Sequence, residues 1–234
     1  MSKNKFKICV SLATNSTDKL PSLITKAIKK RADFFEIRFD HIIYNDIDKA
    51  LEMSSRIKDR AIFTLRSKSE GGFFKGDRKE QIVLIKKMAA IGPMLLDIDL
   101  SLLKQESSLR RFLMNGGIQI LVSSHNFKNT PNTVPLLKKF QDMSKYSNNV
   151  KLVTTARTVE DNFKVLSLYD NRINTNLVAF AMGEFGILSR MLCTLYGSSP
   201  FTYASLNNPL APGQLDIDLM RKVYTTIGNN LKNK

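Results

Sequence analysis

Charged side chains recur at alternate positions in three short apolar segments of the chain. The polar pairs are Glu36 and Arg38 in 34–40, Thr64 and Arg66 in 61–67, and Asp97 and Asp99 in 94–100. Because successive side chains of a strand point to opposite faces, each pair would share one face while its apolar neighbours share the other. Carboxylates and guanidinium groups gathered on such a face could form a charged site. The alternative is an antiparallel sheet with one solvated face, which produces the same alternation.

A histidine and a lysine in two further apolar segments could do acid–base and nucleophilic chemistry. His125 closes the segment 118–125, where an imidazole could take up and deliver protons near neutral pH, although a lone histidine can equally be structural. Lys151 lies between Val150 and Leu152. It either protects an edge strand or is a buried amine. We expect burial, and the arginines of the strands above, to favour the neutral amine, which could form a Schiff base with a carbonyl.

Other reactive motifs are missing from the sequence. The segment 66–72 ends in Gly71-Gly72 but lacks the Lys-Ser/Thr that follows the glycines of a phosphate-binding loop. No group of Cys and His residues has the spacing of a metal site, and neither Cys9 nor Cys193 has a neighbouring histidine. We therefore expect no metal and no other cofactor.

Strand-like and helix-like segments alternate along the whole chain. The strand-like segments are 7–13, 34–40, 61–67, 94–100, 118–125, 150–156, 177–182 and 201–206. A strand–helix unit about every 25–30 residues, repeated eight times, predicts an α/β protein with a single (β/α)₈ barrel domain over residues 1–234. A doubly wound open sheet is the alternative, although the Gly-rich first turn typical of that fold is missing from 13–16.

Two of the helical patterns have a distinct apolar face. In the pattern 158–169, Thr158 is the expected N-cap. The expected buried residues of this helix are Val159, Phe163, Leu166 and Tyr169. In the pattern 215–227, the expected buried residues follow i+4 steps and are Leu215, Leu219, Val223 and Ile227.

The composition excludes several classes of protein. The 234 residues include 43% hydrophobic residues and 24% charged residues, which is typical of a globular protein. No apolar run is long enough for a membrane span, and two cysteines make no disulfide framework, so we expect a cytoplasmic protein. A formal net charge of +15 leaves nucleic acid open as a partner. The lysines are scattered, however, which favours a solvated basic surface.

Seven motifs of the chain closely resemble those of type I 3-dehydroquinate dehydratase. In chain order they are 10–12, 36–41, 66–72, 124–127, Lys151, 182–190 and 211–214. Each motif is weak alone, but all seven occur in the same order and on the expected elements. This family belongs to the shikimate pathway, which leads to chorismate and the aromatic amino acids. The resemblance implies a lyase that dehydrates 3-dehydroquinate to 3-dehydroshikimate without a cofactor, on a TIM barrel, as a homodimer.

The resemblance also implies roles for individual residues. By position, Lys151 matches the Schiff-base lysine, His125 the general acid/base, and Glu70 the carboxylate that orients this histidine. The residues that match the substrate-binding positions are Ser11, Glu36, Ile37, Arg38, Arg66, Arg190 and Gln214. Of these, Arg190 would supply a fork of donors for the substrate carboxylate.

Two positions depart from the family pattern. Leu210 stands where the family has serine, so we expect an apolar lid with fewer hydrogen bonds to substrate. Tyr203 lies in a segment that is one residue longer than the pattern and matches the pocket aromatic. The alternatives to a dehydratase are another Schiff-base lyase of the aldolase type and a basic nucleic-acid-binding protein. A Glu70–His125 pair together with Arg190 favours dehydration of a carboxylated polyol over aldol cleavage.

Overall fold

The computed structural model describes residues 6–171 and 174–232, and in these residues eight parallel strands form one sheet. The strands are β1 (Ile8–Leu12), β2 (Phe34–Arg38), β3 (Ala61–Thr64), β4 (Leu95–Asp99), β5 (Ile120–His125), β6 (Asn149–Thr155), β7 (Asn176–Met182) and β8 (Thr202–Ser205). Their order is β7-β6-β5-β4-β3-β2-β1-β8, and every neighbouring pair is parallel. The predicted barrel is confirmed.

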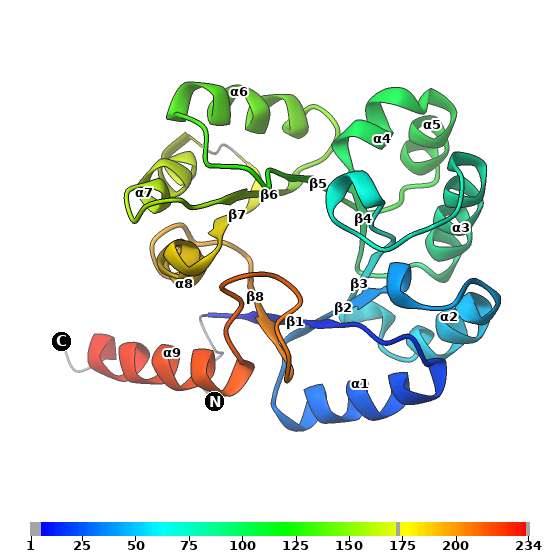
Figure 1. Cartoon of the computed structure of the whole chain (residues 1–234), viewed down its shortest axis with the longest axis horizontal. Coiled ribbons are helices and arrows are strands. Elements are labelled where there is room, and N and C mark those ends of the chain that lie inside the picture. The colour runs from blue at the N-terminus through cyan, green and yellow to red at the C-terminus, as the bar shows by residue number, and fades with distance from the viewer. Residues whose placement is uncertain (1–5, 172–173, 233–234) are drawn as a thin grey trace.

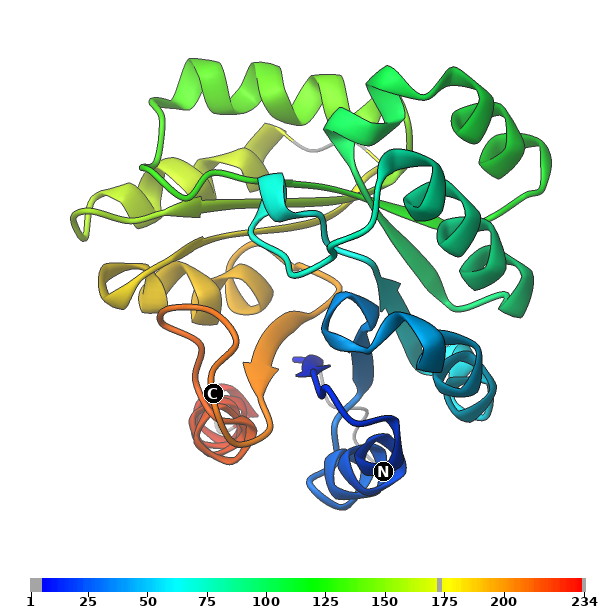
Figure 2. The same ribbon diagram turned by 45° about the vertical axis from the view of Figure 1, so that its right-hand side comes forward.

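Helices surround the strands on the outside of the barrel, as Figure 1 shows. They are α1 (Leu20–Lys29), α2 (Ile47–Ser55), α3 (Arg78–Ile91), α4 (Leu100–Gln105), α5 (Ser107–Asn115), α6 (Thr133–Ser144), α7 (Asp161–Leu166), α8 (Ile187–Leu195) and α9 (Ile217–Lys232). The loop between β8 and α9, drawn in orange in Figure 2, rises beside α8. Within the described part of the chain, no helix combines the length and the apolar character of a membrane span.

The barrel is nearly but not completely closed by backbone hydrogen bonds. Among the described residues, no ladder joins β7 to β8. Side-chain hydroxyls accept hydrogen bonds from backbone N–H groups of β7 instead. The Ala179 N–H donates to the Tyr169 hydroxyl at 2.7 Å, and the Ala181 N–H donates to the Ser189 hydroxyl at 2.9 Å. Helix α8 packs against both strands and covers this seam.

Alternation along each strand separates an apolar outer layer from a polar interior. In β2, Phe35 and Ile37 are fully buried among the apolar residues of the core, whereas Glu36 and Arg38 lie on the opposite face of the strand. The outer face packs under the helices, so it must be apolar, while polar groups collect inside at the carboxyl ends of the strands. The predicted inward set of charged residues therefore arises from strand geometry.

The predicted helix 158–169 differs from the structure at its start. Helix α7 begins at Asp161, and the Asp161 carboxylate accepts hydrogen bonds from the backbone N–H groups of Arg157 and Thr158, so Thr158 is not the N-cap. The acidic side chain closes a turn that precedes the helix. As a result, Val159 and Phe163 are exposed, and the predicted four-residue buried face is wrong at both positions.

The predicted helix 215–227 also begins later than expected. Helix α9 starts at Ile217, and its buried residues are Ile217, Met220 and Tyr224. Leu219, one of the predicted buried residues, is about half exposed. A row of pure i+4 steps drifts around a helix with 3.6 residues per turn, so a buried stripe must mix steps of three and four.

Candidate active site

One cavity at the carboxyl ends of the strands collects nearly all of the predicted site residues. Those that line it are Ser11, Glu36, Arg38, Arg66, Glu70, His125, Lys151, Arg190 and Gln214. They come from six of the eight strands, or the loops that follow them, together with helix α8. The positions Leu210 and Tyr203, where the chain departs from the family pattern, also line this cavity.

Ile37 is the predicted substrate-binding residue that the structure does not bring to the cavity. Its side chain is fully buried in the hydrophobic core and does not line the cavity, because Ile37 alternates with Glu36 and Arg38 along β2. A motif that runs along a strand necessarily contributes alternate residues to opposite faces. Ile37 therefore supports the site by packing.

The Lys151 amine lies inside the barrel between two carboxylates. Its Nζ is 2.9 Å from Glu36 Oε1 and 3.3 Å from Asp97 Oδ2, and the side chain is buried. The aromatic face of Tyr203 lies 4.2 Å from the same nitrogen. The sequence suggested arginines beside this amine, but in the described structure its ion-pair partners are the carboxylates of Glu36 and Asp97.

Glu36 is held in its charged form by these contacts. Burial alone would raise its pKa, but the positive charges of Lys151 and Arg38 lower the pKa of Glu36 to about 2. The Ser11 hydroxyl donates to Glu36 Oε2 at 2.7 Å, and the Thr64 hydroxyl donates to Oε1 at 3.2 Å. The carboxylate thus fixes the lysine amine from strand β2.

Arg66 belongs to a buried network of its own. Its guanidinium donates to Asp97 Oδ2 and the Ser123 hydroxyl, both at 2.7 Å, and to Asp99. Although burial opposes the charge, Asp97 and Asp99 raise the pKa of Arg66 well above its usual value. The alternation in β4 indicated that the two aspartates face inward, but it could not indicate that they bind an arginine from β3.

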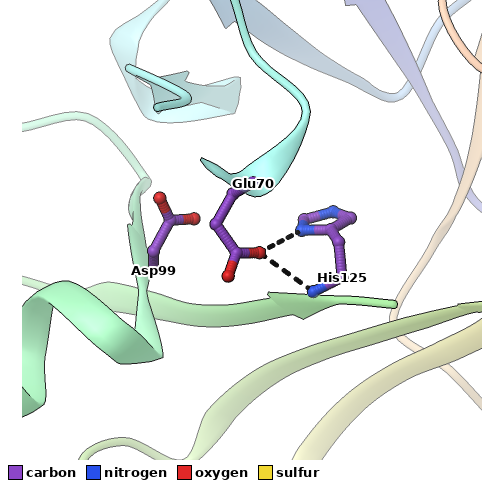
Figure 3. A group of neighbouring side chains, drawn as sticks. All are labelled: Glu70, Asp99 and His125. Atoms are coloured by element: carbon purple, nitrogen blue, oxygen red, sulfur yellow. Dashed lines mark hydrogen bonds and ion pairs between the residues drawn. The ribbon is translucent and has the colours of Figure 1, made fainter. Parts of the chain in front are cut away.

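Glu70 lies between Asp99 and His125 and contacts the histidine, as Figure 3 shows. Glu70 Oε2 accepts a hydrogen bond from the His125 backbone N–H at 3.1 Å and lies 3.3 Å from the ring Nδ1. Burial, and the nearby charge of Asp99, raise the pKa of Glu70 to about 7. Burial and the positive charges of Arg66 and Lys151 lower the pKa of His125 well below its usual value. The imidazole is therefore neutral at pH 7 and can act as a base.

Glu70, Asp99 and His125 are also close enough to share a metal ion. Their potential ligand atoms all lie within 4.8 Å of one another in the described structure. However, Arg66 already donates to Asp99, and Glu70 is hydrogen bonded to His125. The guanidinium thus supplies the positive charge that a cation would bring, and the site fits a hydrogen-bonded acid–base pair better than a metal centre.

Arg190 is a buried cation without a counter-ion. In the described part of the chain its Nε and Nη2 have no hydrogen-bond partner, and the guanidinium lies over the Phe180 ring at 4.2 Å from the centroid. Burial lowers the pKa of Arg190 to about 10, which still leaves it charged at neutral pH. An unpaired buried charge is costly, so this position is suited to an anionic ligand.

The loop after β8 forms the roof of the cavity. Gln214 Oε1 accepts a hydrogen bond from the Leu210 N–H at 2.7 Å, and Gln214 Nε2 reaches the Ser11 hydroxyl at 3.5 Å. The loop is tied to the end of β7 by the Gly183 N–H, which donates to the Pro212 carbonyl at 3.1 Å. Gly213 has φ +71° and leaves no room for a Cβ beside the Gly183 carbonyl.

Comparison with known proteins shows where the chain belongs. The family model described as type I 3-dehydroquinase matches residues 8–231. The chain belongs to the type I 3-dehydroquinase family. The resemblance seen in the sequence motifs is thus confirmed for nearly the whole chain.

Relatives of this family with curated names cover most of the chain. The 3-dehydroquinate dehydratase of Dehalococcoides mccartyi is 37% identical over 89% of this chain and 92% of its own length. That of Thermococcus onnurineus is 34% identical over 87% of this chain and 94% of its own length. Among solved structures, the 3-dehydroquinate dehydratase of Geobacillus kaustophilus has a TM-score of 0.86 at 25% identity, covering 95% of this chain and 91% of its own.

Proposed function

We propose that this chain dehydrates 3-dehydroquinate to 3-dehydroshikimate in the shikimate pathway, through a Schiff base on Lys151. The observation that carries the proposal is that Lys151, the neutral His125 and the unpaired Arg190 line one cavity. These groups supply a nucleophile, a base and a site for a carboxylate. The same proposal takes residues 1–234 as one catalytic domain.

Substrate binding starts from the charge of Arg190. A carboxylate can accept two parallel hydrogen bonds from a guanidinium. The substrate carboxylate would therefore serve as the counter-ion that Arg190 lacks in the described structure. The substrate hydroxyls would meet Ser11, Gln214 and Arg38, which line the same cavity. Arg38 is already held by Asp40 through two hydrogen bonds of 2.8 and 2.7 Å, so its position is fixed before substrate enters.

The protons needed to form the Schiff base all come from the Lys151 nitrogen, so no other acid is required. The Lys151 nitrogen attacks the ketone carbon, and the C–O bond of the ketone is eventually replaced by a C=N bond. Counted from the ammonium form, one of the three nitrogen protons stays on the iminium and two leave with the ketone oxygen as water. The iminium makes the neighbouring C–H acidic, because the electron pair of that bond can move onto the nitrogen.

His125 would carry the proton through the elimination. The neutral imidazole takes the proton from the carbon next to the iminium, which gives an enamine and an imidazolium. The enamine electrons then return, the C–O bond at the β carbon breaks, and the imidazolium protonates the departing hydroxyl. Water hydrolyses the conjugated iminium: its oxygen becomes the enone carbonyl and its two protons restore the lysine ammonium. Because the iminium is the electron sink, this route requires neither metal nor cofactor.

Assembly and location belong to the same proposal. We take the chain as a homodimer, because exposed apolar side chains lie on and just before α7, and at and just before the start of α8. The group consists of Val159, Phe163, Phe185 and Leu188. Asn162, next to Phe163, donates to the Phe185 carbonyl at 2.7 Å, which joins the two segments. Both cysteines are buried and free, which suits a reducing cytoplasm.

The test combines turnover with covalent trapping. With 3-dehydroquinate, we expect an increasing absorbance from the conjugated enone, and with sugar phosphates no cleavage. Borohydride added with substrate should inactivate the enzyme and leave one ligand mass on the peptide that contains Lys151. Lys151→Ala should abolish both signals, whereas Lys68→Ala, on the exposed Lys68 near Glu70, should change neither. A label on Lys68, or full activity without any label, would contradict the mechanism.

A further inference from the structure

Two cations that line the cavity, Lys151 from β6 and Arg190 from α8, each lie over an aromatic ring. The Lys151 nitrogen lies 4.2 Å from the centre of the Tyr203 ring, and the Arg190 guanidinium lies at the same distance from Phe180. The two rings are 6.2 Å apart and come from β8 and β7, the strands that flank the open seam. Together they form an aromatic floor under both charges.

The Lys151 nitrogen is confined to its place above Tyr203. Glu36 from β2 and Asp97 from β4 hold it on two other sides, at 2.9 and 3.3 Å. Lys151 and Tyr203 are only 5% and 3% exposed, so both side chains are enclosed by the protein. A nitrogen that becomes part of an iminium at this position therefore keeps the ring as its neighbour.

The carboxylates of Glu36 and Asp97 also accept hydrogen bonds from groups other than Lys151, so their negative charge is not directed at Lys151 alone. Glu36 also accepts hydrogen bonds from Ser11 and Thr64, and Asp97 accepts them from Arg66 and Ser123. The face of an aromatic ring carries partial negative charge and attracts a cation, most strongly where water is excluded. The Tyr203 ring can thus stabilise a positive charge on the Lys151 nitrogen, and no other cation in the described structure lies over this ring.

We propose that Tyr203 is a further catalytic residue whose aromatic face stabilises the positive charge of the protonated Schiff base on Lys151. The proposal rests on the Schiff-base mechanism above and adds one group to it. The function resides in the ring rather than in the phenol. The Tyr203 hydroxyl is buried and has no hydrogen-bond partner among the described residues, so it does not position the ring.

Borohydride trapping at saturating 3-dehydroshikimate measures the proposal directly, because borohydride reduces the iminium and mass spectrometry counts the adduct. Tyr203→Phe keeps the ring and should trap within about twofold of the unaltered chain. Tyr203→Leu removes the ring and should trap about two- to thirty-fold more slowly, the range from an exposed to a desolvated cation–π contact. The pH at which trapping declines on the alkaline side should also fall, since a less stable iminium loses its proton more readily.

A matched control separates this effect from packing. Phe201 is buried, and its ring lies 5.6 Å from that of Tyr203, but it does not line the cavity. Phe201→Leu therefore removes a ring of similar size from the same core and should leave trapping unchanged. If Tyr203→Leu does not fold, phenylalanine, difluorophenylalanine and pentafluorophenylalanine at position 203 keep the shape of the ring while fluorine progressively weakens its attraction for a cation. Trapping should then fall stepwise.

The outcomes distinguish this proposal from the mechanism on which it rests. An unaltered chain that yields no adduct would overturn the Schiff-base mechanism itself. An adduct on Lys151 that forms equally fast in Tyr203→Leu, or at all levels of ring fluorination, would overturn the role of Tyr203 alone. Equal losses in Tyr203→Phe and Tyr203→Leu would assign the effect to the hydroxyl and would likewise reject the proposal.

Discussion

Glu70 and His125 are joined at two points, since a single carboxylate oxygen lies 3.1 Å from the His125 backbone nitrogen and 3.3 Å from the ring Nδ1. The backbone contact anchors the carboxylate to the strand that carries the histidine, so both groups move together. A carboxylate that accepts the proton of Nδ1 leaves Nε2 as the basic nitrogen. The pair is therefore oriented before substrate arrives.

Activity should depend on the ionisation of Glu70. Because the pKa of Glu70 is raised to about 7, the carboxylate is present above pH 7 and is lost as the pH falls through that value. We expect kcat/KM to fall in the same range. Protonation of His125 contributes only at lower pH, since its pKa is lowered. In Glu70→Gln the fall of kcat/KM near pH 7 should vanish. The kcat of this variant at pH 8 should drop by on the order of 10- to 10²-fold. A pH–rate profile that is the same in both proteins would contradict this role.

Removal of the His125 ring should slow the reaction without preventing the covalent step. His125→Ala is expected to lose at least ~10³-fold in kcat, in the range known for general acid–base catalysis. Borohydride should still label Lys151 in this variant. The other histidine of the chain, His41, provides the control, and His41→Ala should stay within a few-fold of the unaltered rate. Near-normal turnover of His125→Ala would remove this residue from the mechanism.

Glu36 should stabilise the fold in a pH-dependent way. Its pKa is lowered from 4.5 to about 2 in the folded chain, so its contribution is present above pH 4.5 and is lost as the pH falls through 2. Glu36→Gln should therefore reduce the free energy of unfolding at pH 7 by up to about 3 kcal/mol. Urea unfolding at several pH values should show this difference shrinking below pH 4.5. A difference that is constant with pH would assign the loss to packing.

Chelators should leave the activity unchanged. Although Glu70, Asp99 and His125 could approach one metal ion, the Arg66 guanidinium already donates to Asp99. We expect the same initial rate before and after dialysis against EDTA, and no increase on addition of Mg²⁺ or Zn²⁺. A loss of rate that a metal restores would show that the cluster binds a required ion.

The roof position Leu210 should affect binding more than chemistry. Leu210→Ser introduces a hydroxyl beside the substrate, and we expect KM to change within tenfold, about 1.4 kcal/mol, with little change in kcat. Leu210→Ala separates the loss of the leucine side chain from the gain of the hydroxyl. Steady-state kinetics on both variants would measure this, and a collapse of kcat in Leu210→Ser would mean that the roof takes part in a chemical step.

Strand periodicity was sufficient to predict the barrel and the inward-facing residues of β2, β3, β4 and β6. It could not predict contacts across the barrel, such as the one between Lys151 and Glu36, which lie 115 residues apart in the chain. Those contacts depend on the register and stagger of all the strands between them. For this reason the carboxylates around Lys151 and the aspartates around Arg66 were found only in the structure. The start of α7 was missed for a local reason, because the side chain of Asp161 closes a turn ahead of this helix.

The absence of a ladder between β7 and β8 among the described residues also bears on substrate recognition. In a ring closed by backbone hydrogen bonds, only strand side chains and the loops at the rim could reach the interior. Here Arg190 enters from α8, and its own carbonyl accepts a hydrogen bond from the Thr202 hydroxyl of β8. Arg190, to which we assign recognition of the substrate carboxylate, thus belongs to the outer helical layer of the barrel. Mutations in α8 could retune that recognition while the strands that hold Lys151 remain untouched.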